Sequence, residues 1–255
     1  MPKIQKQILY FIFAVCLIII LWYLSEGLKA NPSIETVIKS KVTPTSYFII
    51  ERDDYILSYD ARNRNPLWVL EHLTAEKLEG AIKRDQFKFK EDERIPQIFR
   101  ATIKDYRGSG FDRGHMAPAA NHKSCEKGMA DTFYLSNICP QIPRFNRGYW
   151  AKFEKHVRNL TNEFKDLYII SGGLYIPYND IDGKRYVKYE VFGENNIAVP
   201  THYFKVLILE NESSITQTEA YILPHEDIPF DTSLEKFKVP LEQVEKISGI
   251  LFHSK

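Results

Sequence analysis

The most informative part of the chain is the stretch DRGHMAPAANHKSCEKGMADTFYLSNICPQIPRFNRGYW, which covers residues 112–150. Its first four residues place an acid, a base and an imidazole close together, at Asp112, Arg113 and His115. A histidine in such a cluster can act as a general base near neutral pH. A structural histidine beside a surface Asp–Arg pair gives the same local pattern, so the surrounding residues must distinguish these two interpretations.

The end of this stretch leads into a predicted helix. Apolar residues recur at three- and four-residue spacing from Tyr149 to Phe164, which is typical of a long amphipathic helix. Asn146 lies just before this helix, and Glu154 follows eight residues later, about 12 Å along a helix axis and about 80° around it. An amide oxygen and a carboxylate suit Mg²⁺ better than zinc, so these two residues are candidates to flank one ion through water. Asn146 is equally compatible with an ordinary helix N-cap.

Positive charge is concentrated around these residues. Between Lys104 and Arg158 the chain carries ten basic and five acidic residues, whereas the whole chain has a formal net charge of only +1. The near-neutral total excludes a uniformly basic protein, and the local excess is what contact with phosphate groups requires. The alternative is that Lys152, Lys155 and Arg158 form only the solvated face of the helix.

The rest of the chain after about residue 40 indicates one α+β domain. A helix is predicted from Thr74 to about Ile82, and short helical segments are predicted after Asp231 and Pro240. Runs typical of β-strands lie at residues 47–51, 55–60, 67–73, 167–171, 186–192 and 201–210.

The composition is that of a folded globular protein. The chain has 255 residues, of which 44% are hydrophobic and 26% charged, and this excludes a disordered chain, a collagen and a coiled coil. The three cysteines, Cys16, Cys125 and Cys139, are too few and too scattered for a disulfide framework. The sequence contains no C-x-x-C pair, so it gives no indication of a zinc site.

The N-terminus indicates a membrane anchor. Residues 8–24 carry no charge, and a helix of 17 residues spans about 25 Å, which is enough for a short transmembrane segment. Residues 1–7 form a short basic N-terminus, and residues 25–44 form a linker to a domain that covers residues 45–255. The basic N-terminus favours an orientation with the domain across the membrane. A cleaved signal peptide is the alternative interpretation.

Residues 112–150 resemble the active-site region of the DNA/RNA non-specific endonucleases, in particular the mitochondrial endonuclease G branch. The resemblance rests on DRGH, AANH, DTFYLSN and PQ, followed by Asn146. It continues through YDARNRNPLWVLEHL, YVKYEVFGENNIAVPTHYFKVLILE and KISGILF, and so covers about residues 45–252. Gly173 departs from the family, which often has proline there. The chain stops soon after Phe252, which favours an endonuclease over the longer exonuclease-type relatives.

The resemblance implies a ββα-metal nuclease fold with an antiparallel sheet and flanking helices, preceded by the N-terminal membrane helix. It implies that His115 is the general base, that Asn146 is the single direct protein ligand of Mg²⁺, and that Glu154 holds water bound to the ion. Arg113 matches an arginine that lies near phosphate in the family. Further candidates for contact with the substrate are Asp112, Arg84 and Arg147.

The implied activity is the Mg²⁺-dependent hydrolysis of phosphodiester bonds in DNA and RNA without strong sequence specificity, with Mn²⁺ as an alternative ion. The implied products have 5′-phosphate ends. The resemblance also implies a homodimer at the mitochondrial inner membrane, anchored through residues 8–24 and facing the intermembrane space. The secretory pathway or secretion is the alternative location.

A second hypothesis is a membrane-tethered homologue that binds nucleic acid or a sister nuclease without cutting. Such a protein would be free to lose any one of the three residues that carry the chemistry. Because His115, Asn146 and Glu154 are all present, the sequence favours the enzyme.

Overall fold

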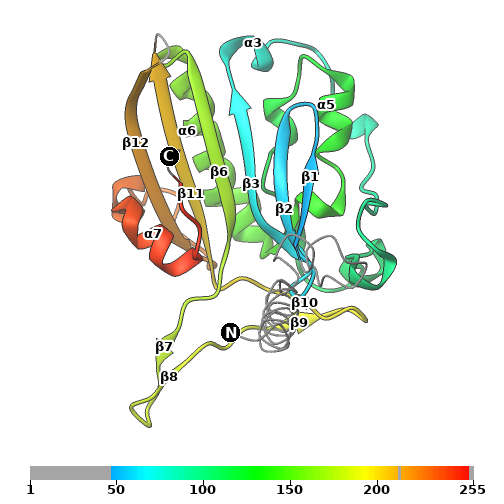
Figure 1. Ribbon diagram of the computed structural model, residues 1–255, viewed down its shortest axis with the longest axis vertical. Coiled ribbons are helices and arrows are strands. Elements are labelled where there is room, and N and C mark those ends of the chain that lie inside the picture. Colours follow the sequence, from blue (N-terminus) through cyan, green and yellow to red (C-terminus); the bar gives the residue numbers. More distant parts are fainter. Residues whose placement is uncertain (1–46, 212–213, 253–255) are drawn as a thin grey trace, which may run out of the picture. The chain divides into compact units, whose positions relative to one another are not determined.

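The computed structural model describes residues 47–211 and 214–252. A seven-stranded sheet, in which every pair of neighbouring strands is antiparallel, runs through this part (Figure 1). The antiparallel sheet expected from the sequence is therefore confirmed. The strand order is β1 (Tyr47–Glu51), β2 (Tyr55–Asp60), β3 (Asn65–Leu73), β6 (Asp166–Leu174), β11 (His202–Asn211), β12 (Ser214–Pro224) and β13 (Lys238–Val239).

The two faces of the sheet carry separate hydrophobic cores. Successive side chains of a strand point to opposite faces, so neighbours in sequence enter different cores. On β6, Ile169 packs in the larger core, whereas Ile170 packs in the smaller one. On β11, Tyr203 and Phe204 divide in the same way.

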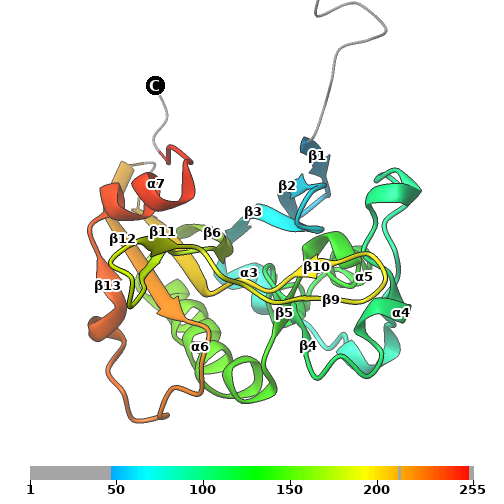
Figure 2. The same cartoon turned by 90° about the horizontal axis from the view of Figure 1, so that it is seen from below.

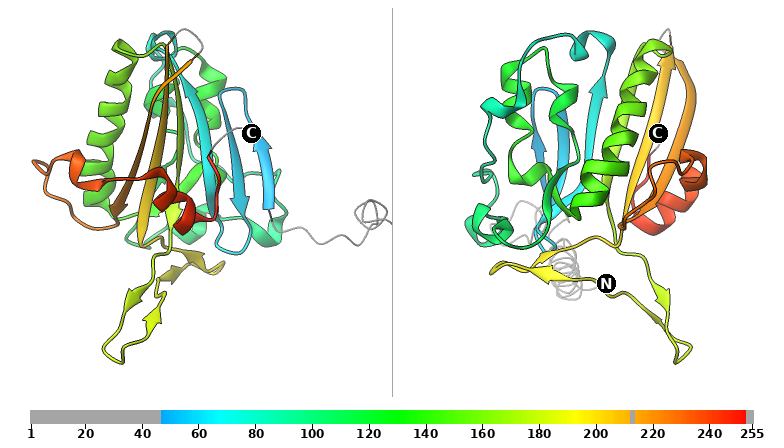
Figure 3. Two further views of the ribbon diagram at one scale, coloured as in Figure 1. Left: turned by 60° about the vertical axis from the view of Figure 1, so that its left-hand side comes forward. Right: turned by 180° about the vertical axis from the view of Figure 1, so that it is seen from behind.

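Helices cover the two faces unequally (Figures 2 and 3). One face carries η5 (Phe145–Trp150), a π-helical turn, followed by α6 (Ala151–Asn159), and Phe153 of α6 packs in the larger core. The other face carries α7 (Leu241–Ser248), whose Val244 packs in the smaller core. The remaining helical elements are α3 (Ala75–Leu78), η1 (Arg84–Gln86), η2 (Gln97–Phe99), α4 (Ile103–Tyr106), η3 (Ala119–Asn121), α5 (Glu126–Asp131), η4 (Leu135–Asn137), η6 (Leu160–Asn162) and η7 (Leu234–Phe237).

A second, two-stranded sheet precedes α6 and lies on the same side of the main sheet. Its strands, β4 (Asp112–His115) and β5 (Ile138–Gln141), pair antiparallel, with Gly114 opposite Cys139. A side chain at Gly114 would collide with Gln141, which is fully buried, so glycine is required for this close pairing. The sequence motif DRGH therefore forms β4, which ends at His115 on the side of the main sheet that carries α6.

The predicted helix over residues 149–164 is confirmed in place, but helical geometry begins earlier, at Phe145, and ends with η6. The prediction of a helix from Thr74 to Ile82 is wrong beyond the first turn, because the observed helix α3 covers only Ala75–Leu78. α3 ends at Leu78 because the backbone is extended at Glu79, with a ψ of 124°, and Gly80 follows with a φ of 152°.

A narrow hairpin projects from the body between β6 and β11 (Figure 1). The sequence predicted one strand over residues 186–192, but the structure has β7 (Tyr178–Asn179) paired with β8 (Arg185–Tyr186), and β9 (Val191–Phe192) paired with β10 (Ile197–Ala198). The prediction of a continuous strand is therefore wrong. Ile181, near the tip, is fully exposed.

The long strand β12 was not predicted from the sequence. It pairs with β11 along nearly its whole length, from His202 opposite Pro224 to Asn211 opposite Ser214. The first half of β12, SITQTE, contains a single apolar residue. It therefore lacks the alternation of apolar and polar residues that predicts a strand.

The predicted anchor at residues 8–24, the basic N-terminus at residues 1–7 and the linker at residues 25–44 lie outside the described residues. Across residues 47–211 and 214–252, no helix is both long enough and apolar enough to cross a membrane.

Candidate active site

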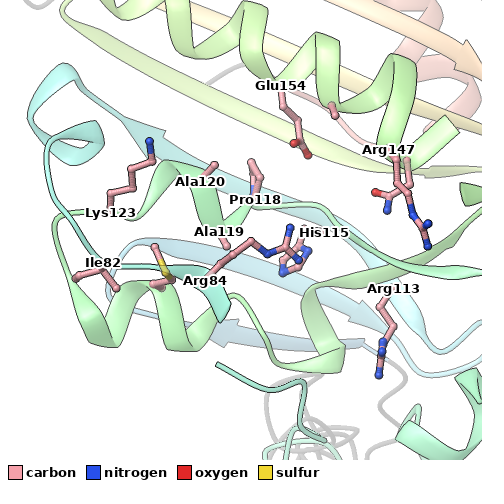
Figure 4. Close-up of a pocket in the computed structure, with 13 residues that line it drawn as sticks. Ile82, Arg84, Arg113, His115, Pro118, Ala119, Ala120, Lys123, Arg147 and Glu154 are labelled. Carbon is pink, nitrogen blue, oxygen red and sulfur yellow. The ribbon is translucent and has the colours of Figure 1, made fainter. Parts of the chain in front are cut away.

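A cleft of about 430 Å³ lies where β4, α5, η5 and α6 meet (Figure 4). It brings together six of the seven site residues predicted from the sequence, since Asp112 alone does not line it. The lining residues are Ile82, Arg84, Arg113, His115, Pro118, Ala119, Ala120, Lys123, Met129, Asn146, Arg147, Ala151 and Glu154.

His115 is the last residue of β4 and is held in an aromatic pocket at the cleft. Its ring centroid lies 5.3 Å from that of Phe89 and 5.2 Å from that of Phe133, and the residue is 8% exposed. Burial lowers the pKa of His115 to about 3, and the positive charge of Arg84 acts in the same direction. No described residue forms a hydrogen bond with its Nε2 atom. The imidazole is therefore neutral near pH 7, and it lines the cleft.

Asn146 lies inside the π-helical turn η5. The helix begins at Phe145, so the interpretation of Asn146 as an N-cap is wrong. Its backbone N–H donates to the Ile142 carbonyl at 3.0 Å, and its Nδ2 donates to Asp112 Oδ2 at 2.9 Å. No described residue donates to its Oδ1, which leaves an amide oxygen available. π-Helical turns inside helices are frequently found at functional sites.

Asp112 lies beside the cleft and organises two of its lining residues. Its carboxylate accepts two hydrogen bonds from Arg147, at 2.7 Å from Nε and 2.6 Å from Nη2, in addition to the bond from Asn146. Burial opposes ionisation of Asp112, but these hydrogen bonds hold its pKa below the ordinary value. The structure thus gives Asp112 protein partners in place of an open position toward substrate.

Glu154 directs its carboxylate from α6 into the cleft, on the side opposite Arg113 (Figure 4). Burial raises the pKa of Glu154 to about 7, although the positive charges of Lys205 and Arg158 oppose this shift. No residue of the described part hydrogen-bonds to this carboxylate. A carboxylate without partners in a cleft is a candidate to bind water or a cation.

The other charged residues of the cleft lining are cationic: Arg84, Arg113, Lys123 and Arg147. The guanidinium group of Arg113 stacks on Phe89, 4.5 Å from the ring centroid. Arg84 extends toward His115 in Figure 4, in agreement with its effect on the histidine. Four cations face one acid, so the cleft is suited to a polyanion.

The oxygen atoms in the cleft fit a hydrated, hard divalent cation. Among the described residues, none hydrogen-bonds to Asn146 Oδ1 or to the Glu154 carboxylate, and both residues line the same cleft. Within residues 47–211 and 214–252, no three His, Cys, Asp or Glu side chains are grouped so that they could hold a metal ion. An ion with few protein ligands that retains several waters, as Mg²⁺ does, matches this donor set.

Three residues that shape the site were not predicted from the sequence. Phe89 and Phe133 enclose the histidine, and Lys205 lies buried behind Glu154. The aromatic residues belong to segments without regular periodicity, and a single lysine in the apolar run of β11 carries no signal that separates a buried from an exposed position.

Comparisons with known proteins agree with this geometry. Residues 34–255 match the sequence model of the DNA/RNA non-specific endonuclease family. The mitochondrial endonuclease G of Homo sapiens is 48% identical over 201 residues, which are 79% of this chain and 68% of that protein. Nuclease C1 of Cunninghamella echinulata var. echinulata is 43% identical over 228 residues, which are 88% of this chain and 90% of that protein.

A solved structure has the same fold. The crystal structure of an EndoG/EndoGI complex matches this chain with a TM-score of 0.79 and 45% sequence identity, and the match covers 88% of this chain and 93% of that chain. The family match spans most of the sequence, and the catalytic cleft lies within it. The chain therefore belongs to the DNA/RNA non-specific endonuclease family and is a nuclease, a hydrolase similar to endonuclease G.

Proposed function

We propose that this nuclease is a metal-dependent endonuclease that hydrolyses phosphodiester bonds of DNA and RNA, with His115 as the general base. Mg²⁺ is the proposed ion, with Mn²⁺ as an alternative. The observation that carries the proposal is that the neutral imidazole of His115 lines the same cleft as Asn146, Glu154 and four cationic side chains.

The proposed reaction uses His115 to accept a proton. Its neutral imidazole takes the proton from a water molecule while the water oxygen attacks phosphorus. The bond between phosphorus and the 3′ oxygen breaks, and the leaving oxygen takes up a proton from solvent. This leaves a 3′-hydroxyl and a 5′-phosphate end. Because the histidine is already neutral near pH 7, no proton has to be removed from it first.

Asn146 would hold the ion through Oδ1, and Glu154 would hold it through water. When bound, Mg²⁺ supplies positive charge that stabilises the negative charge building up at phosphorus and the leaving oxygen. Asp112 orients the Asn146 amide by accepting from Nδ2, and we assign it this positioning role in place of the expected substrate contact.

The substrate would be held by its phosphates. Arg84, Arg113, Lys123 and Arg147 line the cleft and contact a backbone that all sequences share. Such contacts carry no base information, which accounts for activity on DNA and RNA without strong sequence specificity.

The location and assembly are also proposed from the relatives. Several are named mitochondrial, among them human endonuclease G and the mitochondrial nuclease of Saccharomyces cerevisiae. We place this chain at the mitochondrial inner membrane as a homodimer facing the intermembrane space, anchored through residues 8–24. Residence in the secretory pathway is the alternative that fractionation of cells would distinguish.

The test uses the full chain in detergent, incubated with supercoiled plasmid and with structured RNA, in Mg²⁺ or in EDTA. The His115→Ala variant is compared with His156→Ala, which alters an exposed histidine of α6 outside the cleft. We expect both polymers to be cut only with Mg²⁺, at wild-type rate by His156→Ala, and about 10²–10⁴-fold more slowly by His115→Ala.

Cutting at the wild-type rate by His115→Ala would remove the histidine from the mechanism. If the wild-type protein retards both polymers in a gel but cuts neither, the hypothesis of a binding protein that has lost its activity replaces the enzyme. End-labelling of the products with and without prior phosphatase treatment checks the 5′-phosphate.

A further inference from the structure

The segment that follows β12 lies beside η5 and α6 (Figure 2). His225 is its first residue, and the backbone N–H of His225 donates to the Thr201 carbonyl at 3.0 Å. The Nδ1 atom of the imidazole lies 2.9 Å from the Pro200 carbonyl, which can only accept, so Nδ1 carries the proton. Both the backbone and the side chain of His225 are therefore tied to the chain that leads into β11, inside the main sheet.

The other ring nitrogen of His225 holds the chain where it enters η5. Ile142 follows β5 directly, and its backbone N–H donates to His225 Nε2 at 2.8 Å. The carbonyl of Ile142 accepts the Asn146 N–H at 3.0 Å. A neutral imidazole is required for Nε2 to accept, and burial lowers the pKa of His225 to about 4, so the ring is neutral near pH 7. A single residue thus separates the imidazole from the Asn146 backbone.

Aromatic packing places the same imidazole beside the neighbours of two site residues. Its ring centroid lies 5.5 Å from that of Phe145, which directly precedes Asn146. It lies 6.3 Å from that of Phe111, which directly precedes Asp112. Asp112 in turn accepts from Asn146 Nδ2. His225 therefore packs against both segments of chain that fix the direction of the Asn146 amide.

We propose that His225 is a positioning residue for the active site, which fixes Asn146 by holding the chain that enters η5. The inference rests on the proposed role of Asn146 as the protein ligand of the ion. His225 acts only through its neighbours, because it does not line the cleft. Because the pairing of β5 with β4 ends at Gln141, the Ile142 N–H depends on this imidazole for its hydrogen bond.

Two substitutions separate the hydrogen bonds of the imidazole. His225→Gln places an amide oxygen near the position of Nε2, so it keeps an acceptor for the Ile142 N–H. The shorter side chain of His225→Asn places its amide nitrogen near the position of Nδ1. It therefore keeps the donor to Pro200 but loses the acceptor for Ile142. His72→Asn is the matched control, since it alters a partly exposed histidine of β3 that pairs with Asp166 at 2.7 Å.

Hydrogen exchange of the full chain in detergent, without metal or nucleic acid, measures how firmly η5 is held. We expect peptides that cover residues 142–146 to exchange about tenfold faster in His225→Asn, and at the wild-type rate in His225→Gln and His72→Asn. Residues 166–174 of β6 are the internal reference and should keep the wild-type rate in all variants. Unchanged exchange of residues 142–146 in His225→Asn overturns the inference, and so does an equal rise in β6, which would indicate general destabilisation.

Binding of Mn²⁺, followed by the electron paramagnetic resonance of the free ion, relates this anchor to the site. We expect the affinity of His225→Asn for Mn²⁺ to fall about tenfold, whereas that of His225→Gln stays within about twofold of the wild type. Equal losses in the two variants would assign the effect to packing of the ring and overturn the inference. If the wild-type protein binds no Mn²⁺, the proposed ion site fails, whereas the exchange of residues 142–146 still tests the anchor.

The hydrogen bond itself is tested in the wild-type protein, whether or not the variants fold. Scalar coupling between two nitrogen nuclei passes across a hydrogen bond only where that bond is formed. In ¹⁵N-labelled protein we therefore expect a cross-peak between the amide nitrogen of Ile142 and Nε2 of His225. Absence of the coupling overturns the inference even if His225→Asn does not fold.

Discussion

The oxygen atoms that face the cleft are held in very different ways. Asn146 is oriented by hydrogen bonds at both its backbone and its amide nitrogen, so its Oδ1 has a defined direction. The Glu154 carboxylate accepts no hydrogen bond in the described part, so the charges around it have the larger influence on it. The amide is therefore sensitive to changes of hydrogen bonding, and the carboxylate to changes of charge.

Replacement of Asp112 tests the hydrogen bonds that orient Asn146. Asp112→Asn leaves one acceptor oxygen for the three donors of Asn146 and Arg147, so the Asn146 amide is held less firmly, and we expect activity to fall about 10–100-fold. The ion pair with Arg147 is mostly exposed on the arginine side, so the free energy of unfolding should change by less than about 1 kcal/mol. Plasmid nicking and urea denaturation measure the two effects.

Asp227→Asn is the control for this substitution. Asp227 pairs with the exposed Arg144 at 2.8 Å, is itself more exposed than Asp112, and forms no hydrogen bond with Asn146. Equal losses of activity in the two variants would show that a surface ion pair, and not the orientation of Asn146, is what matters.

The residue types of the site could be predicted from the sequence, but not all their roles. The resemblance of residues 112–150 to the family singled out His115, Asn146 and Glu154, and the structure brings all three into one cleft. The partners of Asp112 depend on the pairing of β4 with β5 and on the π-helical turn, and neither leaves a periodic pattern. Lys205 becomes a site residue only because β11 lies in the middle of the sheet.

At the scale of elements, the site depends on the close fit of β4 against β5. Gly114→Ala would place a methyl group against the fully buried Gln141 side chain, which would have to shift within a packed interior. We expect the free energy of unfolding to fall by about 1–3 kcal/mol. Loss of activity should accompany it, because His115 follows directly on the same strand.

Gly148→Ala in η5 is the matched control, since a methyl group there would meet no atom within 4 Å. Alanine in a helical position should raise the free energy of unfolding by about 0.5–1 kcal/mol. Both variants are compared by thermal and urea denaturation. A Gly114→Ala protein as stable as the wild type would show that β4 and β5 can separate without cost.

Most strands with a clear local pattern were predicted, β6 and β11 among them, whereas the short strands of the hairpin between them and the strand β12 were not. β1, β2 and the helix through α6 follow from alternation and helical spacing. The paired edges of the hairpin between β6 and β11 and the strand β12 depend on contacts with distant segments. Only three-dimensional pairing distinguishes such segments from loops.

At the scale of the whole molecule, positive charge is gathered on one side of the sheet. The near-neutral chain places Arg84, Arg113, Lys123 and Arg147 at one cleft, on the side that carries α6. The α7 side has no part in the cleft lining. Association with nucleic acid should therefore depend steeply on salt in spite of the small net charge.

Lys123→Gln tests this dependence in a His115→Ala background, where the bound strand is not cut. We expect the affinity for a labelled duplex to fall, and the slope of log affinity against log salt between about 50 and 200 mM to decrease by about one. Lys246→Gln on α7 removes an exposed lysine from the opposite side and should leave the slope unchanged. Fluorescence anisotropy measures both, and equal slopes would argue against a phosphate contact at Lys123.

The tip of the projecting hairpin is an exposed site at which a protease can cleave the backbone. Lys184 and Arg185 lie close to Gly183 at its tip, near the fully exposed Ile181, and are themselves exposed. Brief digestion with trypsin should cut there first, as followed on a denaturing gel. The two fragments should elute together and keep their nuclease activity, because β6 and β11 remain paired from Leu174 to Asp166. Two separately expressed chains, one ending and the other beginning at this cleavage site, should then associate into an active enzyme.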